Sequence, residues 1–344
     1  MAASAIGTSS KKRKTPARAA RSAKSVVNQL ESIERAGGNG TVRFGSRAAL
    51  NVSSLDKLYF PDDGITKGDV MRYYATVAPL LLPIIKDRPL ILNRFPEGIG
   101  RPAFVQQNAG DKLPPGVRTA KVVTESGTSA VRIIGGDLLT LLYTVQIGTI
   151  PVHAWQARIG SRRFADSTTI DLDPGKGVPF HEVVQLARTI MSELDEAGLT
   201  GAIKTSGSRG LHIALPLPPR TPFDYALRVA QTIAVRVVKR HPKTATVERS
   251  LDARPRRSIY VDAQQNAPGK SVVAAYSVRA RPGATVSAPI ERTELRETLR
   301  LDTFTLQTMP DRVRRVGDLW RVAMTRRNSK RALDRLLRDA NERR

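Results

Sequence analysis

The segment Thr168-Thr169-Ile170-Asp171-Leu172-Asp173-Pro174 constrains the fold and chemistry of this chain more than any other. Its β-branched residues predict a strand, and Pro174 with the following glycine predicts the turn that ends it. Side chains two positions apart on a strand point to the same face, so Asp171 and Asp173 are expected roughly 6–7 Å apart on one side. Such carboxylates repel each other and favour a hard divalent cation. A polar strand end is the alternative, because Asp-x-Asp-Pro-Gly is also good turn chemistry.

The charge of the chain predicts a polyanionic partner. It has 56 lysine and arginine residues against 31 acidic ones, a formal net charge of +25. Nucleic acid is the first candidate partner and an anionic membrane surface the second. No run approaches the roughly 20 apolar residues that span a bilayer, so a soluble protein is expected. The absence of cysteine excludes disulfides and thiolate metal sites, and it fits a reducing interior.

Composition changes only at the two ends of the chain. Residues 1–41 are predicted to be a disordered basic arm, because the first 24 residues contain seven basic and no acidic residues. An organellar transit peptide and, at Lys11–Lys14, a nuclear localisation patch are alternatives. Residues 42–325 are predicted to form one large domain. Residues 326–344 are predicted to be a basic, peripheral, helical tail.

Two lysines flank a predicted turn and helix start. Thr66 is a candidate helix N-cap, and the apolar spacing predicts a helix from Lys67 to about Leu82. Lys57 and Lys67 stand on either side of the turn, where the backbone N–H groups of a helix start also favour anions. Two solvated surface lysines are the alternative.

Two further segments carry polar groups. Residues 202–216 read as two strands joined by a turn in which Ser206, Arg209 and two glycines could meet a phosphate chain, although the Walker spacing is absent. An ordinary hairpin turn is the alternative. Asp262 either completes an acidic site at the end of a strand or begins the turn that follows.

The segment from Ser271 to Arg281 is predicted to be a strand with Arg279 and Arg281 on one face. His153 and Trp155 share a face of the extended segment 150–156, where packing is the alternative to chemistry. Two-metal phosphoryl transfer requires a cluster of acidic residues that holds two cations about 3.5–4 Å apart. It also requires cationic donors along the triphosphate.

In order along the chain, these motifs resemble the polymerase domain of bacterial end-joining DNA ligase D, in the archaeo-eukaryotic primase superfamily. The resemblance runs from about Val52 to Met324. Its motifs are the run at 55–69, Arg88-Pro89-Leu90, His153-x-Trp155, Asp171-x-Asp173-Pro174, Ser206-Gly207-x-x-Gly210-x-His212, Asp262 and Tyr276 to Gly283. It implies an α+β primase-polymerase fold: two β-rich layers with flanking helices, the catalytic sheet being similar to an RNA-recognition motif.

The resemblance also implies roles for individual residues. Two Mn²⁺ or Mg²⁺ ions would be held by Asp171, Asp173 and Asp262. The incoming NTP or dNTP would be contacted by His153, Ser206, Arg209, His212, Arg279 and Arg281, with His153 near the sugar, where family members favour ribonucleotides. Lys57 and Lys67 match the pair that clamps a 5′-phosphate on the downstream DNA strand. Phe104 matches a ring that stacks on template bases.

This chain departs from the family pattern in several places. Val105 stands where a second phenylalanine is common, Asn93 replaces a common lysine, and Arg209 replaces a frequent lysine while keeping its charge. A Lys-x-Asp-Gly adenylation motif is absent, so a stand-alone polymerase that cooperates with a separate ATP-dependent DNA ligase is expected. A Ku-like end-binding protein is a further candidate partner, and the bacterial cytoplasm is the expected location.

The sequence therefore predicts a metal-dependent nucleotidyltransferase that fills short gaps or ends in DNA during break or excision repair, with a preference for ribonucleotides. A primer-independent primase and a non-catalytic basic DNA-binding protein are the alternatives.

Overall fold

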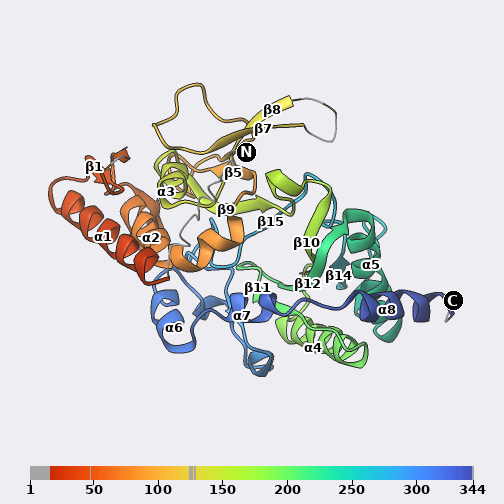
Figure 1. Ribbon diagram of the computed structural model, residues 1–344. Coiled ribbons are helices and arrows are strands. Elements are labelled where there is room, and N and C mark those ends of the chain that lie inside the picture. Colours follow the sequence, from red (N-terminus) through yellow and green to blue (C-terminus); the bar gives the residue numbers. More distant parts are fainter. Residues whose placement is uncertain (1–15, 47, 124–126, 128, 343–344) are drawn as a thin grey trace, which may run out of the picture.

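The computed structural model describes residues 16–46, 48–123, 127 and 129–342 (Figure 1). Within these residues the helices are α1 (Pro16–Arg35), α2 (Lys67–Ile85), α3 (Leu138–Gln146), α4 (Phe180–Glu196), α5 (Phe223–Arg240), α6 (Met309–Val316), α7 (Leu319–Thr325) and α8 (Lys330–Glu342). None of the described helices is both long and apolar enough to cross a membrane.

Two main sheets form the core of the described chain. The larger has the strand order β13–β14–β10–β12–β11–β16. Its strands are β10 (Phe164–Pro174), β11 (Ala202–Thr205), β12 (Leu211–Pro222), β13 (Ala245–Thr246), β14 (Ile259–Asp262) and β16 (Pro289–Ile290). The smaller has the order β15–β9–β5–β6, with β5 (Leu90–Arg94), β6 (Phe104–Gln106), β9 (Thr149–Trp155) and β15 (Ser271–Val273).

Three two-stranded hairpins complete the described β-structure. They are β1 (Gly40–Arg43) with β2 (Ala49–Val52), β3 (Leu58–Phe60) with β4 (Ile65–Thr66), and β7 (Thr119–Val123) with β8 (Ser129–Ile133). Together with the two main sheets and the helices around them, they confirm the predicted α+β class.

Alternation along β10 separates its core face from its functional face. Helices α4 and α5 pack against β10 and β12, and the Thr168 hydroxyl donates a hydrogen bond to the carbonyl of Ala226 in α5 (2.8 Å). Ile170 and Leu172, at the next alternate positions, are fully buried. Asp171 and Asp173 must therefore project from the opposite face of the sheet, away from α5.

The prediction of a disordered arm is wrong for residues 16–41. Residues 16–35 form α1, which packs on α2. Ala23, Val26 and Leu30 are buried, and Glu34 forms an ion pair with Arg72 of α2. The three apolar residues recur at helical spacing among basic ones, so the helix buries one stripe despite its basic composition. The basic run at 11–14 lies outside the described residues.

The C-terminal tail is helical, as predicted, but it is not peripheral. Helix α8 packs on α5 and buries Leu333 and Leu336. The guanidinium of Arg236 in α5 donates to the carbonyl of Leu336 (3.1 Å). The packed core therefore includes helices at both ends of the described chain.

The predicted strand from Ser271 to Arg281 is wrong beyond Val273. Strand β15 ends there, and Tyr276 adopts a left-handed backbone conformation with φ of 69°. A strand cannot continue through that conformation. Arg279 and Arg281 therefore reach their positions from an irregular segment and not from one face of a strand.

Candidate active site

The register of two antiparallel strands brings the predicted acidic residues together. Asp171 of β10 lies directly opposite Asp262 of β14, and Asp173 lies opposite Tyr260. Directly opposed residues of an antiparallel pair point to the same face, with Cβ atoms about 4.5–5.5 Å apart. The backbone therefore places all three carboxylates on the face that is turned away from α5.

Asp171 is held ionised by buried cations and by a histidine. Strand β12 pairs with the other edge of β10, with His212 opposite Asp171, and its Nε2 lies 3.3 Å from Asp171 Oδ1. Burial alone would raise the pKa of Asp171, but His212, Lys204 and Arg279 together lower it below its ordinary value. At neutral pH this carboxylate is an anion.

Lys204, which is fully buried beside His212, was not predicted from the sequence. Its register partner is His212, and its Nζ lies 2.8 Å from His212 Nδ1 and 2.7 Å from Ser287 Oγ. Burial and Asp171 act on its pKa in opposite directions, and burial dominates, so the pKa falls to about 7. The sequence feature that could have indicated it is a single lysine among the apolar and β-branched residues of a predicted strand.

The His212 ring has one consistent assignment. Burial is the largest effect on its pKa and lowers it, so the ring is neutral at neutral pH. Because Ser287 Oγ donates to the carbonyl of Thr205 (2.8 Å), it accepts from Lys204, whose ammonium can also donate to His212 Nδ1. Nε2 then carries the proton and faces Asp171.

The turn between β11 and β12 is tied closely to β10. Ser206 Oγ accepts hydrogen bonds from the backbone N–H groups of Ser208 and Gly210 (both 3.1 Å), so it shapes the turn. A Cβ on Gly210 would lie 1.9 Å from the carbonyl oxygen of Leu172, which requires glycine at this position. Arg209 of the same turn has 58% of its side chain exposed, and its guanidinium lies 3.9 Å from the Asp173 carboxylate.

A cavity of about 320 Å³ lies over these groups. Both main sheets contribute to it: its polar lining is His153, Asp171, Asp173, Ser206, Ser208, Arg209, His212, Gln265, Ser271 and Arg279. Arg281 lies beside it and contacts the Ser208 hydroxyl. The cavity therefore combines carboxylates with hydroxyls and cations that suit a phosphate chain.

His153 enters the cavity from β9 as a neutral ring. Burial, Arg279, Lys204 and His212 all lower its pKa, to about 3. Uncharged, it can offer one donor and one acceptor. This placement brings together the sequence-predicted His153, His212, Arg209 and Arg279, which come from separate parts of the chain.

The three carboxylates have the donor chemistry of a site for hard divalent cations, since all supply oxygen. Burial, Asp171 and Asp262 raise the pKa of Asp173, whereas Arg209 and Arg254 lower it, and the net pKa is raised. That repulsion is what a cation would relieve. Asp262, however, accepts hydrogen bonds from Gln264 N–H (2.6 Å) and Gln265 Nε2 (3.1 Å). Within the described residues, no three acidic or histidine side chains converge as a metal-binding group.

Lys57 and Lys67 lie together at the start of α2. The Lys67 N–H donates to the Lys57 carbonyl (2.8 Å), and Thr66 caps the helix through a capping box with Asp69. Burial, then Lys57, lowers the pKa of Lys67 to about 8. The Nζ of Lys57 lies 2.9 Å from the Glu97 carboxylate. The Nζ of Lys67 donates a hydrogen bond to the carbonyl of Ser53 (2.8 Å). Both lysines thus lie near the helix N-terminus, which favours anions, but their ammonium groups are turned to different acceptors, Glu97 and Ser53.

Phe104 lies on β6 with 48% of its surface exposed, and the Arg94 guanidinium lies 5.0 Å from its ring centroid. The neighbouring Val105 is 57% exposed. An exposed ring backed by a cation offers a stacking surface.

We expect Lys204 to make stability depend on pH. Its pKa is about 7 in the folded chain, well below the pKa of an exposed lysine. Between these two pKa values, the side chain binds a proton in the unfolded chain but not in the folded one. Stability should rise with pH in that window. Lys204→Met should reduce the rise, measured by urea unfolding at several pH values, whereas Lys121→Met, at an exposed position, should not. An undiminished rise in Lys204→Met would contradict the assignment.

Residues 66–320 match the family described as the LigD primase-polymerase domain. The multifunctional non-homologous end joining protein LigD of Pseudomonas aeruginosa is 32% identical over 269 residues, covering 77% of this chain and 31% of that protein. The corresponding DNA repair protein of Mycobacterium tuberculosis H37Rv is 34% identical over 285 residues, covering 80% of this chain and 37% of that protein. The bifunctional LigD of Bacillus subtilis is 32% identical, and the match covers 78% of this chain and 43% of that protein.

The matched region thus spans less than half of each of these relatives. Among solved structures, the polymerase domain from Mycobacterium tuberculosis Ligase D in complex with DNA matches with a TM-score of 0.75 and 31% identity, covering 81% of this chain and 99% of that one. The chain belongs to the family of LigD primase-polymerase domains.

Proposed function

We propose that this chain is a DNA-dependent nucleotidyltransferase that fills short gaps or ends during DNA repair, using two divalent cations and preferring ribonucleotides. The observation that carries the proposal is the strand register that sets Asp171 opposite both Asp262 and His212, beside a cavity lined with cations. Membership of the LigD polymerase-domain family and a net charge of +25 also support it.

In the proposed mechanism the carboxylates and the cationic side chains of the cavity have separate tasks. Asp171, Asp173 and Asp262 would hold the Mn²⁺ or Mg²⁺ ions, which when bound supply a lowered pKa for the primer 3′-hydroxyl and charge neutralisation for pyrophosphate. Arg209 and Arg279, with the hydroxyl of Ser208, would orient the triphosphate. Lys204 would hold His212 in the tautomer that donates toward Asp171. The neutral His153 would contact the sugar.

The remaining roles concern the DNA. Lys57 and Lys67 would bind a 5′-phosphate on the downstream strand, and Phe104 would stack on a template base. A separate ATP-dependent ligase would seal the product, and a Ku-like protein is a candidate for recruiting the chain to broken ends.

Asp171→Asn should abolish primer extension. Loss of one preorganised electrostatic group costs about 10²–10³ in rate, so at least a 100-fold loss is expected. The assay is extension of a primer across a 5′-phosphorylated gap with Mn²⁺, scored for ribonucleotides and deoxyribonucleotides. Asp302→Asn, at a carboxylate with 62% of its side chain exposed, is the matched control and should behave as wild type. Full extension by Asp171→Asn would refute the proposal, and DNA binding without extension by wild type would indicate a non-catalytic DNA-binding protein.

The preference for a 5′-phosphate should fall as pH rises through about 8. Lys67 is protonated below its pKa of about 8 and loses its charge above it, so its attraction to phosphate weakens on the alkaline side. The measurement is the ratio of extension on 5′-phosphorylated and 5′-hydroxyl gaps across pH. Lys67→Met should give a low, flat ratio, and Lys86→Met, at an exposed position, should follow wild type. A wild-type ratio that is constant through this range would contradict the role of Lys67.

A further inference from the structure

Asn266 is a buried polar residue that the roles proposed above do not use. Only 1% of its surface is exposed, and it ends the turn at residues 263–266 that follows β14. Burying an amide side chain is costly unless its hydrogen bonds are satisfied. Its Oδ1 accepts from the N–H of Thr169 (2.7 Å), and its Nδ2 donates to the carbonyls of Thr169 (2.7 Å) and Ala263 (2.8 Å). The side chain therefore binds only backbone groups, on β10 and within its own turn.

The Asn266 amide takes the place of a strand residue opposite Thr169. In the pairing of β10 with β14, Asp171 lies opposite Asp262, so continued pairing would set Gln264 opposite Thr169. Strand β14 ends at Asp262, however, and the chain turns away. A side-chain amide offers a donor and an acceptor, as a peptide group does. Asn266 thus extends the β10–β14 ladder by one position beyond the end of the strand.

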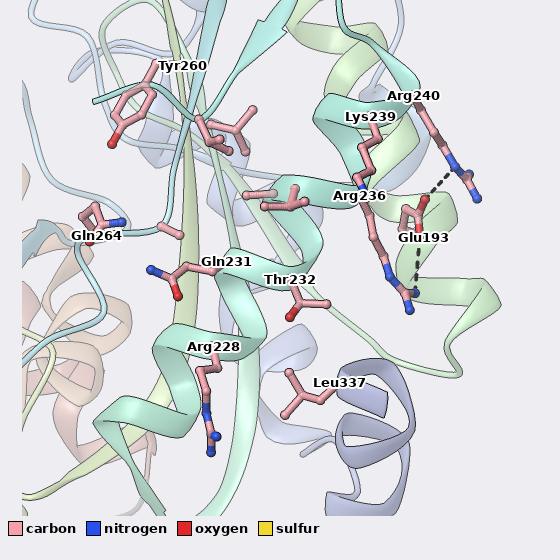
Figure 2. A pocket seen from close by; sticks show the side chains of 15 residues that line it. Glu193, Arg228, Gln231, Thr232, Arg236, Lys239, Arg240, Tyr260, Gln264 and Leu337 are labelled. Atoms are coloured by element: carbon pink, nitrogen blue, oxygen red, sulfur yellow. Dashed lines mark ion pairs between the residues drawn. The ribbon is translucent and has the colours of Figure 1, made fainter. Parts of the chain in front are cut away.

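The turn that Asn266 anchors carries the groups that hold the Asp262 carboxylate. The N–H of Gln264 donates to Asp262 Oδ1 (2.6 Å), and Nε2 of Gln265 donates to Oδ2 (3.1 Å). The two glutamines face different cavities. Gln264 lies beside a cavity of about 590 Å³ along α5, where Figure 2 labels it, and Gln265 lines the candidate active site. The turn is therefore held to β10 by the buried Asn266 and not by packing of its two glutamines.

This anchor joins two of the three carboxylates of the candidate site. Thr169 lies two positions before Asp171 on β10, and the turn bound to Thr169 fixes the atoms that contact Asp262. Strand register alone places the backbone of Asp262, whereas the anchored turn also restricts its side chain. Groups that orient metal ligands decide much of the affinity of a metal site.

We propose that Asn266 is a positioning residue of the metal site, which holds the Asp262 carboxylate where it can share a divalent cation with Asp171. The inference rests on the proposed polymerase function. Asn266 acts through the turn and touches neither the ion nor the nucleotide.

The test compares Asn266→Ala with Asn328→Ala. Asn328 is a matched control, because it is 6% exposed and its side chain makes the same set of hydrogen bonds. Its Oδ1 accepts from the N–H of Thr200 (2.7 Å), and its Nδ2 donates to the carbonyls of Thr200 (2.9 Å) and Pro216 (3.0 Å). Asn328 and these two partners lie outside the described lining of the candidate active site.

Binding of Mn²⁺ to the full chain is measured without nucleotide, from the electron paramagnetic resonance signal of the free ion. Asn266→Ala should weaken binding about 10-fold or more, as is typical when a residue that supports metal ligands is removed. Asn328→Ala should bind as wild type. Primer extension by Asn266→Ala should recover at high Mn²⁺ concentration because its three carboxylates remain, whereas Asp171→Asn should not recover.

Equal Mn²⁺ affinity of Asn266→Ala and wild type would overturn the inference, because Asn266 would then serve stability alone. Equal weakening by Asn328→Ala would also overturn it. Urea unfolding without metal shows whether each variant is folded. If Asn266→Ala is not, the same outcomes are read from Asn266→Ser, whose shorter side chain keeps a hydroxyl but cannot span both backbone groups of Thr169.

Failure of the proposed function gives a different result. Wild type and Asp171→Asn would then bind Mn²⁺ equally, and the metal site itself would be wrong. Loss of binding by Asp171→Asn with full binding by Asn266→Ala would remove only the role of Asn266.

Discussion

The pairing of β10 with β14 on one side and β12 on the other is the constraint on which the rest of the candidate site depends. It sets Asp171 opposite Asp262 and His212 at once. A slip of one residue would turn Asp171 and Asp173 toward α5 and bury two charges among apolar side chains. The alternate residues Thr168, Ile170 and Leu172 prevent that slip, because they pack under the helices. The apolar core and the acidic face are thus specified by the same strand.

The same strand pairing decides how the charges of Asp171 and Asp173 are compensated. The buried Lys204 and the half-buried Arg279 lower the pKa of Asp171, whereas burial and Asp171 raise the pKa of Asp173. Asp171 is therefore compensated within the protein, whereas Arg209 and Arg254 compensate Asp173 only in part. Buried charges are costly without partners, and the chain tolerates this imbalance at the place where a divalent cation and a triphosphate are proposed to bind.

Local patterns predicted the local structure well. The strand at Thr168–Pro174, the N-cap at Thr66 and the turn at Ser206–Gly210 are each visible within a few residues of sequence. Register was not predictable, since the pairing of Asp171 with Asp262 joins segments 91 residues apart. Lys204 was missed because only the fold shows which face of β11 it occupies. Helix α1 was missed because its basic residues obscured a narrow apolar stripe, and Tyr276 gave no sign of its left-handed backbone.

The location of bound manganese tests directly whether these carboxylates hold two cations. Crystals of the full chain grown with Mn²⁺ and a non-hydrolysable nucleoside triphosphate would be measured at the manganese absorption edge. We expect anomalous peaks for two ions contacting Asp171 and Asp173, with Asp262 rotated away from Gln264 to reach one of them. The absence of any peak at these carboxylates, with nucleotide bound in the cavity, would contradict this expectation.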